Sequence, residues 1–243
     1  MCWREVCAYS AVGSRKHGAS QALGGLIRAA KDPALLRLAP AWLCINAIVG
    51  LWLGPTLTFL FTLDNRQGQF LTGLFAKEPE RVGIVLLGYA VVFAIGVTLW
   101  SFVLHRFARK TVLTAALVAM LLVCLGLYLL NQSGAWPAWV RVVILVITAI
   151  LIMVESGFTP AALSLLADVV GAQNGRGAAM GIYNVLLSLG SLAGSILGGI
   201  LAQQFFINGI VYGTLVMALI ALLTVRALPA TQAKQIPTPR GNA

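Results

Sequence analysis

Long apolar runs recur along the chain, and short polar or basic segments separate them. Their 3.6-residue periodicity is weak, as expected for helices that are apolar on nearly all sides. Each run approaches or exceeds the roughly 20 residues that a helix needs to cross about 30 Å of hydrocarbon. The pattern predicts an all-α integral membrane protein with six spans, near residues 41–63, 82–104, 111–130, 142–166, 178–203 and 208–225. The short alternating segments of a transmembrane barrel do not occur.

The polar segments at the two ends divide the chain into three parts. Residues 1–33 form a predicted cytoplasmic leader, in which "ALGGLIRAAKDP" is typical of an amphipathic linker helix on the membrane surface. Residues 34–226 form the six-helix transmembrane domain, and residues 227–243 a disordered cytoplasmic tail. Gly54-Pro55, within the first span, predicts a bend, because proline removes a backbone hydrogen bond from a helix.

Composition supports the membrane assignment, and the distribution of charge gives the orientation. Charged residues are only 10% of the chain, and the mean hydropathy is +0.90, whereas soluble domains carry roughly a quarter charged residues. Six alternating spans place thirteen of the 17 Lys and Arg residues on the side of both termini. The other four are Arg66, Lys77, Arg81 and Arg141. By the positive-inside rule both termini are cytoplasmic, so the net charge of +10 indicates topology, and no nucleic-acid partner is expected.

The reactive side chains are too few for an enzyme of a familiar kind. The four cysteines form no C-x-x-C pair, and the two histidines, His17 and His105, lie in predicted cytoplasmic segments. We therefore expect no metal site and no cofactor. A serine hydrolase would need a histidine at membrane depth, and the spans contain none.

Glu155 is the exceptional residue of the apolar runs, near the middle of "AILIMVESGFTPAAL", residues 149–163. An ionisable group near the bilayer centre costs about 2.5 kcal/mol or more, so it normally faces a partner or a wet cavity. No basic residue lies at matching depth in the six spans. Either the acid is protonated and packed as a neutral group, or water reaches it. We favour a water-filled pathway.

Polar residues form stripes at helical spacing on three spans, with plain helix packing as the alternative interpretation. The candidate residues of a substrate or proton pathway are Glu155, Thr148 and Thr159 on the fourth span, Asn46 and Thr58 on the first, and Asn184 and Ser188 on the fifth. Beside the last stripe, Gly190, Gly194 and Gly198 form a seam that lets two helix backbones approach closely. The third and sixth spans have few polar groups, and we expect them to face lipid.

Two local motifs and the order of helix types resemble the major facilitator superfamily. The loop "SFVLHRFARK", residues 101–110, is similar to that family's G-x-x-x-D-R-x-G-R-K signature. It keeps three basic residues, Arg106, Arg109 and Lys110, and replaces glycine, aspartate and glycine by Ser101, His105 and Ala108.

The second motif lies in the fifth span. There, "GSLAGSILGG" resembles the antiporter motif G-x-x-x-G-P-x-x-G-G at Gly190, Gly194, Gly198 and Gly199, with Ser195 in place of proline. The segment "ESGFTPAALSLLADVVGAQNGRGAAMGIYN", residues 155–184, is similar to the family's tenth-to-eleventh helix region.

The resemblance covers roughly residues 20–226 and implies the C-terminal six-helix half of a transporter, without the first six helices. In this family the substrate site lies between the two halves. The resemblance therefore implies a six-helix partner, either an N-terminal half chain or a second copy, in addition to the lipid bilayer and a small-molecule substrate of unknown identity. It also implies a cytoplasmic latch, in which Arg106 or Arg109 pairs with Asp168.

Three functions remain open at this point. The first is transport of a small solute by alternating access, coupled to protons or another ion, in the plasma (inner) membrane. The second is a non-transporting membrane scaffold or subunit, or an inactive gene remnant. The third, an intramembrane enzyme acting on lipids, lacks a catalytic constellation, so we do not expect an enzyme.

Overall fold

The structure is a computed structural model that describes residues 33–53, 55–63 and 68–227. The predicted leader, except for its last residue, and the tail beyond residue 227 lie outside the described residues. In the described ranges every regular element is a helix, and six helical stretches are long and apolar enough to cross a membrane. These stretches are Ala39–Thr62, Pro79–Arg106, Arg109–Asn131, Ala138–Leu165, Tyr183–Phe205 and Ile207–Ala227. The predicted fold class, an all-α membrane protein with six spans, is confirmed.

The described helical elements outnumber the six spans. The elements are α2 (Pro33–Leu53), α3 (Pro55–Thr62), η1 (Pro79–Arg81), α4 (Val82–Val103), η2 (Leu104–Arg106), α5 (Arg109–Asn131), η3 (Ser133–Ala135), α6 (Ala138–Glu155), α7 (Phe158–Phe205) and α8 (Ile207–Ala227). The first span comprises α2 and α3, and Gly54, where the sequence predicts a bend, lies outside the described residues. The fourth span changes from α6 to α7 directly after Glu155.

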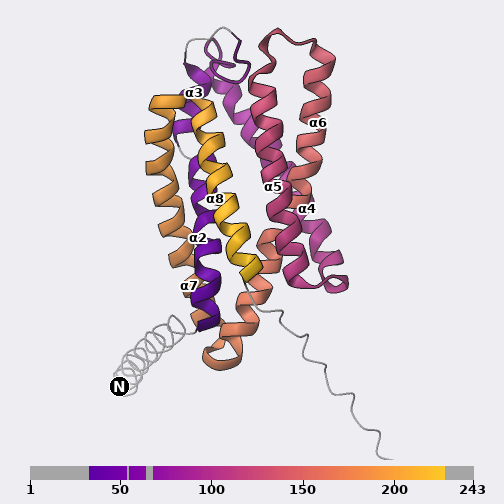
Figure 1. The fold of residues 1–243 in the computed structure, drawn as a ribbon, viewed down its shortest axis with the longest axis vertical. Helices are drawn as coiled ribbons and strands as arrows, with labels where there is room; N and C mark the ends of the chain where they lie inside the picture. The colour runs from indigo at the N-terminus through magenta and orange to yellow at the C-terminus, as the bar shows by residue number, and fades with distance from the viewer. Residues whose placement is uncertain (1–32, 54, 64–67, 228–243) are drawn as a thin grey trace, which may run out of the picture.

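The helices alternate in direction along the bundle, as successive membrane spans must. Figure 1 shows the start of α2, the connection from α4 to α5 and the end of α8 at the lower end. The connections from α5 to α6 and from α7 to α8 lie at the upper end. The fourth and fifth spans are joined without a non-helical loop, because α7 stays helical for 48 residues through the predicted turn "GAQNGRG". In Figure 1, α7 turns at the lower end between its salmon and orange parts.

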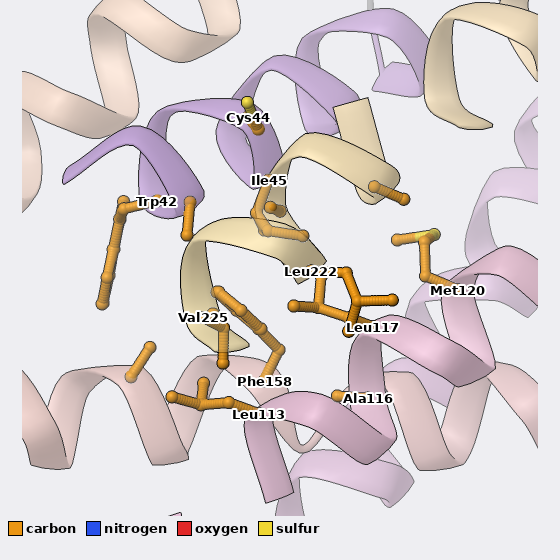
Figure 2. Close-up of a cluster of buried hydrophobic side chains, with 14 of the residues drawn as sticks. Trp42, Cys44, Ile45, Leu113, Ala116, Leu117, Met120, Phe158, Leu222 and Val225 are labelled. Carbon is orange, nitrogen blue, oxygen red and sulfur yellow. The ribbon is translucent and has the colours of Figure 1, made fainter. Parts of the chain in front are cut away.

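Two clusters of buried apolar side chains hold the bundle together. In the first, Trp42 of α2, Leu113 of α5, Phe158 of α7 and Val225 of α8 converge (Figure 2). The second lies towards the upper end and includes Leu60. Because α5 and α8 contribute to both clusters, 44% and 39% of the third and sixth spans are buried, against 11% and 22% of the second and fifth. The expectation that the third and sixth spans are the lipid-facing ones does not fit this arrangement.

Asn131, at the end of α5, ties the upper loop to the bundle. Its carbonyl accepts a hydrogen bond from the Phe70 amide at 2.7 Å. Its side-chain Oδ1 accepts one from the Leu71 amide at 3.1 Å, and its Nδ2 donates to Oδ1 of Asn208 on α8 at 2.9 Å. Asn131 is fully buried, so the Asn131 side of each of these bonds lies away from water.

Candidate functional site

Glu155 is the last residue of α6, and it lies inside the six-helix body. Only 8% of the residue is exposed. Tyr89 of α4 and Cys124 of α5 lie within electrostatic range of its carboxyl group. Glu155 forms no ion pair with any described residue. The ion pair within the described ranges joins Arg81 to Glu78, near the upper loop. The structure thus keeps an acid at membrane depth without a basic partner in the described part of the chain.

The break after Glu155 follows from a serine–glycine pair, which commonly marks a kink in a long helix. The Ser156 amide still bonds to the Ile152 carbonyl at 2.9 Å, but the Gly157 amide bonds to the Val154 carbonyl at 3.3 Å. In an uninterrupted helix the Gly157 amide would bond to the Met153 carbonyl instead. The break therefore withdraws the ordinary backbone donor from Met153, one turn before α7 begins.

Two side chains donate to the Met153 carbonyl in place of that amide. The Ser156 hydroxyl lies 2.7 Å from it, and the indole Nε1 of Trp100, on α4, lies 3.0 Å from it. A buried backbone carbonyl without a donor is costly, so these bonds stabilise the broken helix. α4 comes this close because Gly96 has no side chain: a Cβ there would overlap the Ser156 hydroxyl and approach the Met153 backbone.

The other polar residues of the fourth span face the bundle interior. Thr148 is buried, its hydroxyl donates to the Ile144 carbonyl at 2.8 Å, and it lies against Gly126 of α5. Thr159, in the first turn of α7, is partly buried. Of the predicted stripe on the fourth span, Thr148 is therefore buried between α6 and α5, and Glu155 is buried at the break.

The polar residues of the first span, and the small residues of the fifth, meet at a close contact between α2 and α7. Asn46 is buried, and its Nδ2 donates to the Trp42 carbonyl at 2.8 Å. Ser191 donates to the Asn46 carbonyl at 3.4 Å, and Ser195 to the Gly50 carbonyl at 3.3 Å. These serine hydroxyls therefore bond to the backbone of α2.

The glycines of the predicted seam occupy different environments. A Cβ on Gly190 would overlap Asn46, and one on Gly194 would overlap the Ala47 carbonyl. Gly198 is buried, whereas a Cβ on Gly199 would meet nothing within 4 Å. The close approach of α7 to α2 thus requires the first two glycines.

The predicted pathway residues do not form one surface. Thr58 on α3, and Asn184 and Ser188 on α7, are exposed at the side of the six-helix body. Glu155, Thr148 and Asn46 are buried within it. The structure brings Glu155 and Thr148 to the α4–α5–α6 side, and Asn46 to the α2–α7 contact.

The basic loop motif bonds to the lower ends of two other helices. The Arg109 guanidinium donates to the Ser164 carbonyl of α7 at 3.4 Å, and the Lys110 ammonium donates to the Arg226 carbonyl near the end of α8 at 3.0 Å. Arg106, in η2, is exposed. The Asp168 side chain lies outside the described residues, so its pairing with Arg106 or Arg109 stays a prediction.

Sequence reasoning missed Trp100, Gly96 and Ser156 as parts of the site. An open groove of about 310 Å³ adjoins Trp100, lined by Leu99, Trp100, Val103, Ile150, Met153 and Val154. The Ser156-Gly157 pair inside an apolar run was the available signal for a break. Nothing in the spacing of Trp100 pointed to α6, because that contact is made across the bundle. In the described ranges no group of three His, Cys, Asp or Glu side chains is arranged to hold a metal.

Comparison with known families agrees with this architecture. The family model described as the Major Facilitator Superfamily matches residues 43–242. The chain belongs to this family of membrane transporters, and it is an integral multi-pass membrane protein. Among curated proteins and solved structures, no significant match to the chain is found.

Proposed function

We propose that the chain moves a small solute across the membrane by alternating access, as the Glu155-bearing half of a secondary transporter of this family. Glu155 is the group that binds a proton, another cation or the substrate in each cycle. The membrane concerned is the plasma (inner) membrane. The observation that carries the proposal is a buried carboxyl, unpaired among the described residues, at the break between α6 and α7.

A broken helix suits such a role for two physical reasons. Interrupted membrane helices expose backbone groups that coordinate ions and substrates, and transporters of several folds use them near the midplane. A break also lets two helix segments change their relative angle without unfolding either. Because Glu155 is only 8% exposed here, alternating access requires a second arrangement of α6 and α7 in which water or solute reaches the carboxyl.

The exposed polar residues support a second six-helix body beside this one. Asn184 and Ser188 are exposed at the side of α7, and polar groups in a span normally face the bundle interior or a wet cavity rather than lipid. The second and fifth spans are also the least buried of the six. We propose that these two spans contact the partner body and that the solute passes between the two.

Solute-driven proton movement in proteoliposomes tests the proposal. The protein, with its natural six-helix partner where it has one, is reconstituted with an internal pH-sensitive dye and exposed to a panel of amino acids, sugars, organic acids and organic cations. We expect one class to drive proton flux, and Glu155→Gln to lower that flux at least about tenfold, as removal of an essential proton-transfer group does. Glu80→Gln is the matched control, because Glu80 is an exposed acid in η1, in the first turn of the second span.

The two other outcomes contradict the proposal at different points. Full solute-driven flux in Glu155→Gln would remove this carboxyl from the transport cycle. No flux with any solute in the wild-type assembly, together with unchanged biological activity of Glu155→Gln, would favour a non-transporting scaffold or subunit.

A further inference from the structure

We propose that Trp100 is a positioning residue for Glu155. Its indole N–H holds the Met153 carbonyl at the α6–α7 break and so fixes the direction in which the Glu155 carboxyl points. The importance of that direction for transport rests on the proposed function, but the contact itself and its effect on Glu155 do not.

The Met153 carbonyl accepts its hydrogen bonds from side chains. Its usual donor, the Gly157 amide, is bonded to Val154, and the Ser156 hydroxyl donates to Met153 from within the break itself. The Trp100 indole donates from another helix. Of the two side-chain donors, the indole is therefore the one that connects the break to another helix, α4.

One face of α4 packs closely against the break. Gly96 and Trp100 are four residues apart, so they lie on the same face of α4. Gly96 admits Met153 and Ser156, while the Trp100 ring lies against Gly157, where any Cβ would overlap the indole. One face of α4 thus contacts both residues of the break and the turn before it.

The contact with Trp100 lies on both sides of Glu155 along the chain. Glu155 stands between Met153, which the indole holds, and Gly157, which the ring covers, so its backbone is fixed on both sides. Trp100 also borders an open apolar groove of about 310 Å³ between α4 and α6. Movement of the indole towards this groove would break its bond to Met153 and leave α7 free to change its angle to α6.

Trp100→Phe tests the hydrogen bond, because it keeps an aromatic ring and removes the donor. Trp52→Phe is the matched control: Trp52 is also partly buried, and its Nε1 donates to Thr214 of α8 at 2.8 Å. In each background, the infrared difference between the protein and its Glu155→Gln derivative isolates the carboxyl bands of Glu155. We expect Trp100→Phe to shift these bands and Trp52→Phe to leave them in place. Identical bands in Trp100→Phe and wild type would overturn the proposal, whatever the transport assay shows.

Hydrogen exchange gives a second measurement that needs no substrate. Loss of one hydrogen bond should speed amide exchange in peptides covering residues 152–161 about threefold to tenfold in Trp100→Phe, and not in Trp52→Phe. Equal exchange in the two variants would show that the indole does not hold the break.

A pair of glycine variants tests the same contact if Trp100→Phe does not fold. Gly96→Ala forces α4 away from Met153 and Ser156, so it should reproduce the band shift and the faster exchange. Gly88→Ala, on the same helix with open space around it, should do neither. An unchanged carboxyl spectrum in a folded Gly96→Ala protein would also overturn the proposal.

Discussion

At the residue scale, the polar side chains with the clearest energetic role are those that bond to backbone groups. Trp100, Ser191 and Ser195 each donate to a backbone carbonyl of another helix. A backbone group in a membrane cannot turn to water, so such bonds are worth keeping even where the side chain costs something to bury. Glu155 differs from them, because no described basic residue pairs with its carboxyl group.

Hydrogen bonds of Asn131 to backbone and side-chain groups should stabilise the upper end of the bundle. Asn131→Leu removes the acceptor of the buried Leu71 amide and the donor to Asn208. A buried donor left unsatisfied costs about 1–3 kcal/mol, so the melting temperature in detergent should fall. Gln132→Leu, at the exposed next position, should change stability by less than about 0.5 kcal/mol. Equal melting temperatures for the two variants would show that the loop is not held through Asn131.

At the element scale, the contact between α2 and α7 depends on individual glycines. Gly194→Ala places a methyl group on the Ala47 backbone, and overpacking of this kind costs typically 1–3 kcal/mol. Gly199→Ala meets open space and should be neutral or stabilise the helix by about 0.5–1 kcal/mol. Thermal unfolding of the two variants in one detergent measures the difference. A Gly194→Ala protein as stable as Gly199→Ala would mean that the two helices are farther apart than described.

The loop motif gives a second prediction at this scale. Arg109 already donates to Ser164, one helical turn before Asp168, so a pairing with Asp168 needs no large movement. Arg109→Asp or Asp168→Arg alone should lower the melting temperature, and the double variant should recover part of the loss, because exchanged partners restore the attraction. Arg106→Asp combined with Asp168→Arg tests the other arginine. If neither double variant exceeds its single variants, the latch does not exist.

The sequence predicted the elements far better than their contacts. Run length and hydropathy sufficed for six spans, since a membrane helix satisfies its own backbone and needs only an apolar surface. The sequence did not predict the break at Ser156-Gly157, because serine and glycine are also tolerated inside continuous membrane helices. Trp100 could not be assigned to Glu155, because the fold alone brings α4 to α6. At the contact between α2 and α7, Asn46, Ser191 and Ser195 combine helix packing with polarity, which one sequence cannot separate.

At the scale of the whole molecule, hydropathy does not show whether an apolar span faces lipid or the protein core. Lipid chains and a protein core are equally apolar, so an uncharged helix fits either environment. The third and sixth spans carry few polar groups, yet α5 and α8 lie in the core clusters. Exposed large apolar residues lie on α4, α6 and the second part of α7, and also on α8. The second and fifth spans are the least buried of the six, and Asn184 and Ser188 are exposed on the fifth.

The orientation of the bundle in the membrane is a separate property, which the basic residues predict. Arg106, Arg109 and Lys110 lie at the end of the bundle that also holds the start of α2 and the end of α8 (Figure 1), and by the positive-inside rule this end faces the cytoplasm. Lys77 and His105 are exposed near opposite ends, so they suit a labelling test in a background whose native cysteines are replaced.

A membrane-impermeant maleimide should label Lys77→Cys in intact cells, and should label His105→Cys only after permeabilisation. Replacing Lys77 also removes one of only four basic residues on the predicted outer side, which strengthens the charge asymmetry rather than weakening it. Inversion of the insertion by the substitution itself is therefore not expected. His105→Cys labelled in intact cells, with Lys77→Cys protected, would reverse the orientation and place the Arg109 loop outside. Glu155 would keep its position at the helix break, but each side of its pathway would exchange compartments.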